Sequence, residues 1–132
     1  MIFEFLIPKR PVSLQTGKRA NLQSWKAYVK SEAAKNWNNR MYSGAEIQLT
    51  LIYLCDENPV DTDNIIKPIQ DALVGLIYDD DINITDVDSH RRPLIGTFDL
   101  SGLPTTLSKG ILSGSECVYV RIRLARALED YL

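Results

Sequence analysis

Residues 61–81 read DTDNIIKPIQDALVGLIYDDD, a short apolar segment with acidic residues at both ends. The apolar residues recur at helical spacing, which predicts a helix with a buried stripe. This stripe consists of Ile66, Ile69, Leu73, Leu76 and Ile77. Pro68 has no N–H and belongs in a first turn, so the regular helix should start within residues 64–67. Asp61 and Asp63 then lie at or just before the helix N-terminus, where the helix dipole favours carboxylates and equally a phosphate.

The residues before this segment predict two strands and one longer helix. Residues 2–7 alternate as a strand, and residues 8–19 form a basic loop. A helix is expected from a cap at Asn21 to about Arg40. Its apolar face consists of Leu22, Trp25, Val29, Ala33 and Trp37. The position of both tryptophans on this face favours core packing over stacking on nucleic-acid bases. Residues 45–54 follow as a second strand.

The residues after the acidic helix predict two further strands. Residues 82–92 alternate loosely and residues 117–125 alternate clearly, whereas residues 100–115 are rich in Gly, Ser, Thr and Pro and are expected to form a loop. The element order is therefore β-α-β-α-β-β. This order predicts an α+β fold in which two helices cover a mixed sheet. With 132 residues and no linker, the chain is expected to form a single domain over residues 1–132.

The composition is that of a globular protein without a membrane span. The hydrophobic share is 45% and the charged share is 24%, and no apolar run approaches the ~18 residues of a transmembrane helix. Cys55 and Cys117 both lie in apolar, strand-like contexts, and two cysteines give no disulfide framework. We therefore expect buried free thiols in a cytoplasmic protein.

Charge is segregated along the chain despite a net charge of only −2. Residues 1–40 carry eight Lys and Arg residues, whereas residues 54–88 carry ten acidic residues against Lys67 alone. Basic residues return with Arg91 and Arg92. Basic regions around an acidic centre suit a polyanion held over a metal site. The alternative for the helix lysines is a solvated face, and a pI near 5.3 argues against tight nonspecific DNA binding.

The acidic residues form a candidate cation site. Asp61 and Asp63 are two residues apart in an extended segment, so their side chains point to the same side. Asp80 or Asp81 completes the set if the two ends of the short helix meet. Such close carboxylates repel and raise each other's pKa unless a cation lies between them, and a hard divalent cation takes oxygen ligands. Lys67 lies four residues after Asp63, on the same helical face, where it can neutralise transition-state charge or position a water. This arrangement favours metal-assisted phosphodiester hydrolysis.

The same residues also have simpler structural interpretations. Asp63 can be only an N-cap, and Lys67 with Asp71 can be only a surface pair worth a few tenths of a kcal/mol. Residues 79–81 can be only a hairpin turn.

Two other chemistries fail on spacing. A calcium loop fails because Ile65 and Ile66 stand where a further oxygen ligand and a glycine are required, and the stretch from Asp79 fails likewise at Ile84. Nucleophilic hydrolysis fails because the single histidine, His90, has no nucleophile-elbow context. His90 is expected to be structural, although its neighbours Arg91 and Arg92 would allow it to touch a phosphate.

Residues 61–81 resemble the core of the RusA family of Holliday-junction resolvases. The family pattern is D-x-D-N-x-x-K, then D-A-L, then a D-D pair followed by a strand. The matching residues here are Asp61, Asp63, Asn64, Lys67, Asp71-Ala72-Leu73 and Asp80-Asp81. The resemblance covers about thirty residues of the chain, and residues 7–13 loosely echo the family's proline-containing basic loop.

The resemblance implies a homodimeric, magnesium-dependent endonuclease that binds four-way junctions and nicks two strands symmetrically, with Mn²⁺ as an alternative ion. A two-fold dimer suits a two-fold substrate. By position, the family's metal-binding aspartates fall on Asp61, Asp63 and Asp81, with Asp80 as the alternative to Asp81 because of the triple aspartate. The family's essential lysine falls on Lys67.

The main hypothesis is therefore a structure-selective DNA endonuclease of recombination and repair. In this hypothesis Lys67, Asp61, Asp63 and Asp81 are catalytic. The candidate phosphate contacts are Lys9, Arg10, Lys18, Arg19, Arg91 and Arg92. One alternative is a catalytically inactive DNA- or metal-binding module of the same fold, and another is a nuclease or phosphohydrolase that acts on a different substrate.

Overall fold

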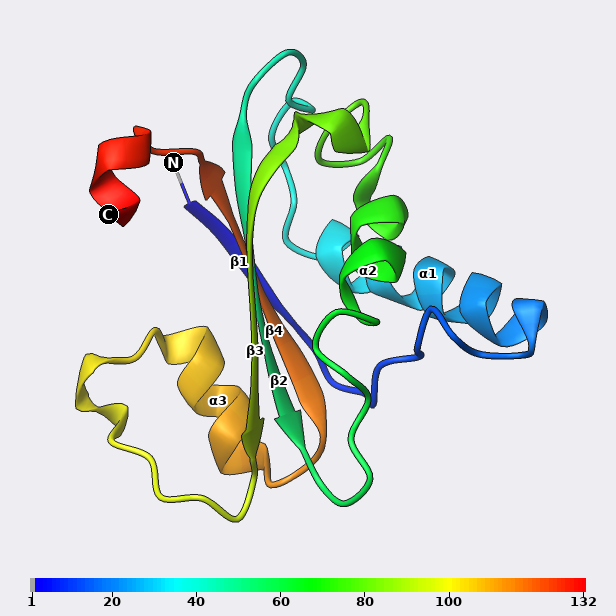
Figure 1. The fold of residues 1–132 in the computed structure, drawn as a ribbon, viewed down its shortest axis with the longest axis vertical. Coiled ribbons are helices and arrows are strands. Elements are labelled where there is room, and N and C mark those ends of the chain that lie inside the picture. Colours follow the sequence, from blue (N-terminus) through cyan, green and yellow to red (C-terminus); the bar gives the residue numbers. More distant parts are fainter. Residues whose placement is uncertain (1) are drawn as a thin grey trace.

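A computed structural model of the chain describes residues 2–132. Its centre is a four-stranded sheet with the strand order β1-β4-β2-β3 (Figure 1). The strands are β1 (Ile2–Ile7), β2 (Ile47–Cys55), β3 (Ile84–Pro93) and β4 (Cys117–Leu124). β4 pairs antiparallel with both β1 and β2, whereas β2 and β3 are parallel. The sheet is therefore mixed, as the sequence predicts.

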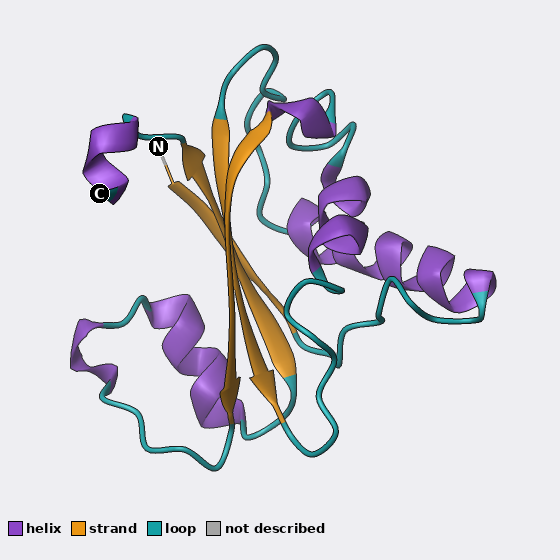
Figure 2. Cartoon of the chain, in the orientation of Figure 1, coloured by secondary structure: helices purple, strands orange, loops and turns teal. Residues whose placement is uncertain are grey.

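Helices cover both faces of this sheet (Figure 2). α1 (Arg19–Ala34) and α2 (Ile66–Leu73) pack against each other on one face, and α3 (Thr105–Ser113) packs against β1 and β4 on the other. Three short 3-10 turns are η1 (Asp81–Asn83), η2 (Leu100–Gly102) and η3 (Leu128–Tyr131). The parallel strands β2 and β3 are joined through α2, because parallel neighbours need a crossover connection.

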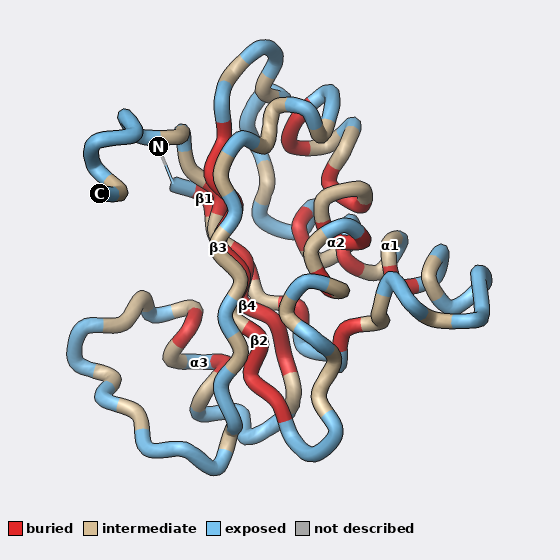
Figure 3. The backbone as a smooth tube through the Cα atoms, viewed as in Figure 1, coloured by how far each residue is buried: buried red, intermediate tan, exposed pale blue. Residues whose placement is uncertain are grey.

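The two faces of the sheet carry a large and a small apolar core. The larger core, under α1 and α2, includes Trp25, Val29, Leu49, Leu51, Ile69 and Leu73. The smaller core, under α3, consists of Leu54, Leu107, Cys117 and Tyr119. Successive residues of a strand face opposite sides, so the central strand β2 contributes to both cores and is buried along almost its whole length (Figure 3).

The third helix corrects the sequence prediction. The prediction of a loop over residues 100–115 was wrong, because α3 and η2 form there. Leu107 and Ile111 lie one helical turn apart and pack in or against the smaller core. Gly110 lets α3 approach the sheet, since an added Cβ would lie 2.9 Å from Leu6 Cδ1. Tertiary packing here overrides the weak helix propensity of a segment rich in Gly, Ser and Thr.

The first predicted helix forms, but with different boundaries. α1 begins at Arg19, ahead of the predicted cap at Asn21, and ends at Ala34. Trp25 is only 1% exposed in the larger core, and Trp37 packs against this core from beyond the helix end. The expectation that both tryptophans are packing residues is therefore confirmed.

The second predicted helix is shorter than its apolar stripe. α2 ends at Leu73, and Gly75 adopts a left-handed φ of 84°, which only glycine tolerates at little cost. Leu76 and Ile77, predicted as part of the helical stripe, lie in the turn after the helix. Ile77 is nevertheless buried, so the apolar pattern reports burial correctly but not helix length.

Both cysteines are free and buried within residues 2–132, as expected. Cys55 lies in the larger core and Cys117 in the smaller one. Burial raises the pKa of Cys117 to about 11. None of the described helices is both long enough and apolar enough to cross a membrane.

Candidate functional site

Residues 57–64, here called the acidic segment, lead from the end of β2 to the start of α2. Two side chains of β3 hold the backbone of this segment. Ser89 Oγ donates to the carbonyl oxygen of Thr62 (2.8 Å), and the guanidinium of Arg91 donates to the carbonyl oxygen of Val60 (3.3 Å). The acidic segment is thereby attached to the edge strand of the sheet.

The loop between β1 and α1, residues 8–18, runs along the acidic segment. The N–H of Leu14 donates to the carbonyl oxygen of Asn64 (2.9 Å). Four residues earlier in the loop, the guanidinium of Arg10 donates to the carbonyl oxygen of Asn58. These two contacts place a basic loop beside the segment that carries Asp61 and Asp63.

The first two predicted metal ligands are both exposed. The Asp61 side chain is 73% exposed, with Oδ1 3.8 Å from Nη1 of Arg91. At Asp63 it is the backbone carbonyl oxygen that accepts a hydrogen bond, from the N–H of Ile66 (3.4 Å). The N-cap of α2 is Ile65, whose side chain carries no acceptor. The interpretation of Asp63 as a side-chain N-cap is therefore wrong, and its carboxylate is left at the surface.

Lys67 lies between two carboxylates in the first turn of α2. Its Nζ is 2.9 Å from Oδ1 of Asp71 and also contacts Oδ2 of Asp81. Asp71 is shared with Lys26 of α1, whose Nζ lies 3.5 Å from Oδ2. The hydrogen bonds that Lys67 donates to Asp81 and Asp71 raise the pKa of its ammonium group to about 12. The predicted pair of Lys67 and Asp71 is confirmed, and Lys67 carries its charge at neutral pH.

A tight chain reversal after α2 brings Asp81 back to Lys67. The N–H of Gly75 donates to the carbonyl oxygen of Tyr78 (2.8 Å). The buried Tyr78 hydroxyl donates to the carbonyl oxygen of Gln70 (2.6 Å), so the returning chain is fastened to the helix. Burial raises the pKa of this tyrosine, which keeps the hydroxyl a donor.

The three consecutive aspartates have three different environments. Asp79 accepts from Ser43 Oγ (2.8 Å) and from Asn83 Nδ2 (2.7 Å), and these hydrogen bonds lower the pKa of its carboxyl group. Asp80 caps η1, with Oδ1 accepting a backbone N–H at 3.1 Å. Asp81 faces Lys67, which is the main cause of its lowered carboxyl pKa. The two aspartates therefore have different partners: Asp81 contacts Lys67, whereas Asp80 caps η1.

The donor types at this site fit a hard divalent cation, but the predicted carboxylates do not converge. Among residues 2–132, no three His, Cys, Asp or Glu side chains are grouped closely enough to hold a metal ion. Asp61 and Asp63 come from one exposed segment, and Asp81 is paired with the ammonium of Lys67. A cation held by all three carboxylates would require Asp81 to leave the ammonium of Lys67 and bind the cation instead.

The predicted phosphate contacts fall into two groups. Lys9 lies over the ring of Tyr28, with Nζ 5.1 Å from the centroid, and Lys18 and Arg19 are exposed where α1 begins. Arg92 is exposed on β3 and donates to the preceding carbonyl oxygen at 2.9 Å. The other two predicted contacts are Arg10 and Arg91, whose guanidinium groups donate to backbone carbonyl oxygens of the acidic segment.

Glu116 is a polar residue that sequence reasoning missed. It lies just before β4, and its side chain is only 10% exposed. Its carboxylate accepts from Arg10 Nη1 (3.1 Å), the Tyr53 hydroxyl (2.8 Å) and the N–H of Asp56 (3.1 Å). Burial, followed by the bond to Glu116, raises the pKa of Tyr53. No local pattern reveals this group, because Arg10 and Glu116 are 106 positions apart in the chain.

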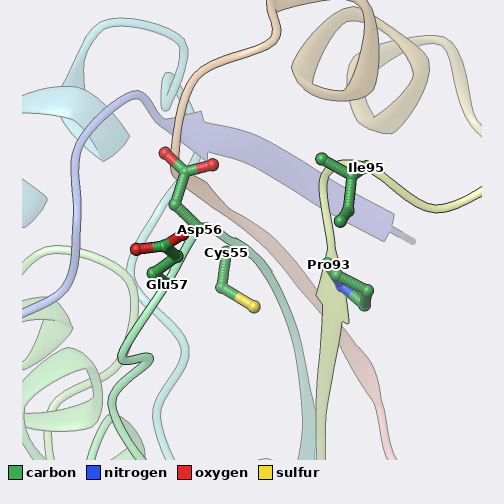
Figure 4. Close-up of a pocket in the computed structure, with 5 residues that line it drawn as sticks. All are labelled: Cys55, Asp56, Glu57, Pro93 and Ile95. Carbon is green, nitrogen blue, oxygen red and sulfur yellow. The ribbon is translucent and has the colours of Figure 1, made fainter.

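A surface pocket of about 530 Å³ lies where β2 and β3 end (Figure 4). It is lined by Cys55, Asp56, Glu57, Pro93 and Ile95. Burial raises the pKa of the Cys55 thiol, which disfavours a reactive thiolate. The Cys55 thiol is therefore not a candidate nucleophile, and the acidic segment and Lys67 remain the candidate site.

The fold and the site together define a class: an α+β protein in which a D-x-D-N-x-x-K turn precedes a crossover helix and a later aspartate returns to the motif lysine. The family model of endodeoxyribonuclease RusA matches residues 9–93, more than half of the chain. The chain belongs to this family of endodeoxyribonucleases, which act on Holliday junctions. A comparison with curated proteins finds no match.

Proposed function

We propose that the chain is a magnesium-dependent endonuclease that resolves four-way DNA junctions in recombination and repair. The observation that carries this proposal is the contact between Lys67 and Asp81. Lys67 lies in the first turn of the crossover helix and Asp81 lies 14 positions later, after the chain reversal that follows the helix. The family pattern that residues 61–81 resemble has a lysine and an aspartate at these two positions. A surface ion pair with Asp71 alone would not need Lys67 to contact a second carboxylate, and Asp81 belongs to the D-D pair that resembles the family pattern.

In this proposal Asp61, Asp63 and Asp81 would hold the divalent ion, Mg²⁺ or Mn²⁺, once Asp81 exchanges Lys67 for the ion. The bound ion would lower the pKa of a water molecule and stabilise negative charge on the phosphate. Lys67 stabilises charge that develops on the phosphoryl oxygens. Its pKa of about 12 makes it a poor general base at neutral pH, so its role is that of a cation.

The basic loop supports DNA as the substrate. Residues 8–18 are bonded to the acidic segment through Leu14 and Asn64, and the exposed cations Lys18 and Arg19 lie at the end of this loop and the start of α1. We assign phosphate contacts to Lys9, Lys18, Arg19 and Arg92. These contacts would hold a polyanion whose scissile phosphate approaches the exposed carboxylates.

Symmetric cleavage follows if the chain acts as a homodimer. A four-way junction has approximate two-fold symmetry, and a two-fold dimer offers one site to each of two strands. Each protomer would then make one nick, and the paired nicks would resolve the junction.

The test compares wild type with Asp63→Asn on labelled four-way junction and on linear duplex, with and without Mg²⁺. The matched control is Asp99→Asn, the same chemical change at an exposed aspartate that caps η2. We expect paired nicks in the junction with wild type and the control, and none with Asp63→Asn or with a chelator. Cleavage of duplex and junction alike would identify a different nuclease, and junction binding without any cleavage would identify the inactive module.

A further inference from the structure

Arg10 makes its contacts within the protein even though the sequence places it in a basic loop. Its guanidinium donates to the carbonyl oxygens of Glu57 (3.4 Å) and Asn58, and to the carboxylate of Glu116 (3.1 Å). A guanidinium has five N–H donors in a planar fork, and this geometry suits several fixed acceptors. Arg10 therefore links the loop before α1, the start of the acidic segment and the residue before β4.

Glu116 anchors this link in the sheet. Its side chain is 10% exposed, whereas that of Arg10 is 46% exposed. Besides Arg10, it accepts from the hydroxyl of Tyr53, which is fully buried in β2, and from the N–H of Asp56. A mostly buried carboxylate with three donors is costly to disturb, because each lost partner leaves a desolvated group unpaired.

The segment that is held here needs an external support. Asn58 has a positive φ of 53°, and Asn58 is the one non-glycine residue among residues 2–132 with a positive φ. Asparagine tolerates the left-handed region better than most residues, but at some cost. The hydrogen bond from Arg10 falls on the carbonyl oxygen of this same residue, three positions before Asp61.

We propose that Arg10 and Glu116 are positioning residues that hold the acidic segment in its reactive conformation, and that Arg10 is not a phosphate contact. This proposal rests on the proposed function for its catalytic consequence, but not for its structural part. Arg10 fixes the first residues of the segment, and Arg91, Ser89 and Leu14 fix its later carbonyls. The exposed aspartates are then presented on a backbone that is fastened at both ends.

The consequence for catalysis follows from geometry. A reacting group displaced by about 1 Å can slow an enzymatic reaction on the order of 100-fold, even when the mutated residue lies away from the chemistry. Loss of Arg10 or Glu116 should therefore lower the cleavage rate while leaving junction affinity nearly unchanged. Glu116 makes this prediction sharp, because an acidic residue cannot itself contribute attraction to a phosphate.

The experiment uses full-length Arg10→Gln and Glu116→Gln, with Glu32→Gln as the matched control. The Glu32 side chain is 11% exposed and pairs with Lys35 at 2.8 Å, so it resembles Glu116 in burial and pairing but lies on α1. For each variant, hydrogen–deuterium exchange is measured over residues 56–64, together with junction affinity against salt and the single-turnover cleavage rate. If Glu116→Gln does not fold, Tyr53→Phe removes one donor from the same carboxylate with little change in packing.

We expect faster exchange over residues 56–64 and at least about tenfold slower cleavage in both Arg10→Gln and Glu116→Gln, with the salt dependence of binding as in wild type. The double variant should be no slower than the slower single variant, because both changes break one network. Glu32→Gln should behave as wild type.

A phosphate contact at Arg10 would give a different result. Arg10→Gln would then reduce the slope of log affinity against log salt by about 0.9, and Glu116→Gln would leave cleavage and exchange unchanged. That outcome would overturn the proposal. The exchange measurement needs no cleavage, so it tests the network even if wild type leaves junctions intact.

Discussion

Ile69 gives the sharpest test of how the fold supports the site. It is fully buried in the larger core, on the helix whose first turn carries Lys67. Replacing it with alanine removes three methyl or methylene carbons from a packed position, which should lower the free energy of unfolding by about 2–5 kcal/mol. Ile69→Val removes only one and should cost about 0.5–1.5 kcal/mol. The larger loss is a substantial fraction of the ~5–15 kcal/mol that stabilises a typical domain.

The assay is equilibrium unfolding in urea, followed by the fluorescence of Trp25 and Trp37. Trp25 is buried on α1, the helix that packs against α2, so it reports on this core directly. The matched control is Ile82→Ala, because Ile82 is 77% exposed and should change stability by no more than ~0.5 kcal/mol. A loss for Ile69→Ala below about 1 kcal/mol, or equal to that of the control, would refute the packing described here.

Three further predictions concern groups elsewhere in the fold. Cys55 and Cys117 should react with a thiol reagent only on unfolding, since both are buried and the pKa of Cys117 is raised to about 11; reaction of the native protein within minutes would contradict this. Hydrogen bonds from Ser43 to Asp79 and from Lys67 to Asp81 lower the carboxyl pKa of each aspartate in the folded state, so the unfolded state binds more protons at acid pH and stability should fall as the pH drops through the usual titration range of aspartate. In Asp79→Asn the free energy of unfolding, measured in urea at low salt, should depend less on pH in this acid range. An unchanged pH dependence would contradict the hydrogen bonds of the Asp79 carboxylate. Gly110→Ala should lower the melting temperature, because its Cβ would lie 3.1 Å from Cys117 Sγ; a rise would show that α3 is loosely packed.

Local patterns predict most of the fold because they report burial. Three strands alternate, β2 is rich in residues that favour β structure, and the stripe on α2 is apolar, so the existence of these elements follows from the sequence. The third helix does not, since Gly110 and its neighbours have weak helix propensity and become helical by packing on Leu6 and Cys117. The early end of α2 also depends on a conformation, the positive φ of Gly75, that the apolar pattern does not reveal.

The candidate site is predictable where its residues are close in the chain. The spacing of Asp61, Asp63 and Lys67 places them in and just before the first turn of α2, and the family resemblance adds Asp81. That these side chains share one ion stays a prediction. The roles of Arg10 and Glu116 depend instead on a contact between distant positions, which charge alone does not indicate. The basic character of the loop suggests phosphate binding, whereas the hydrogen bonds show that the guanidinium of Arg10 binds acceptors within the protein.

The most direct test of the central claim is junction cleavage by Asp81→Asn beside Asp80→Asn. The two substitutions make the same chemical change at adjacent positions, but only Asp81 contacts Lys67, while Asp80 caps η1. We predict that Asp81→Asn abolishes Mg²⁺-dependent paired nicking of a four-way junction and that Asp80→Asn retains it. Loss of cleavage in Asp80→Asn with full activity in Asp81→Asn would contradict the account.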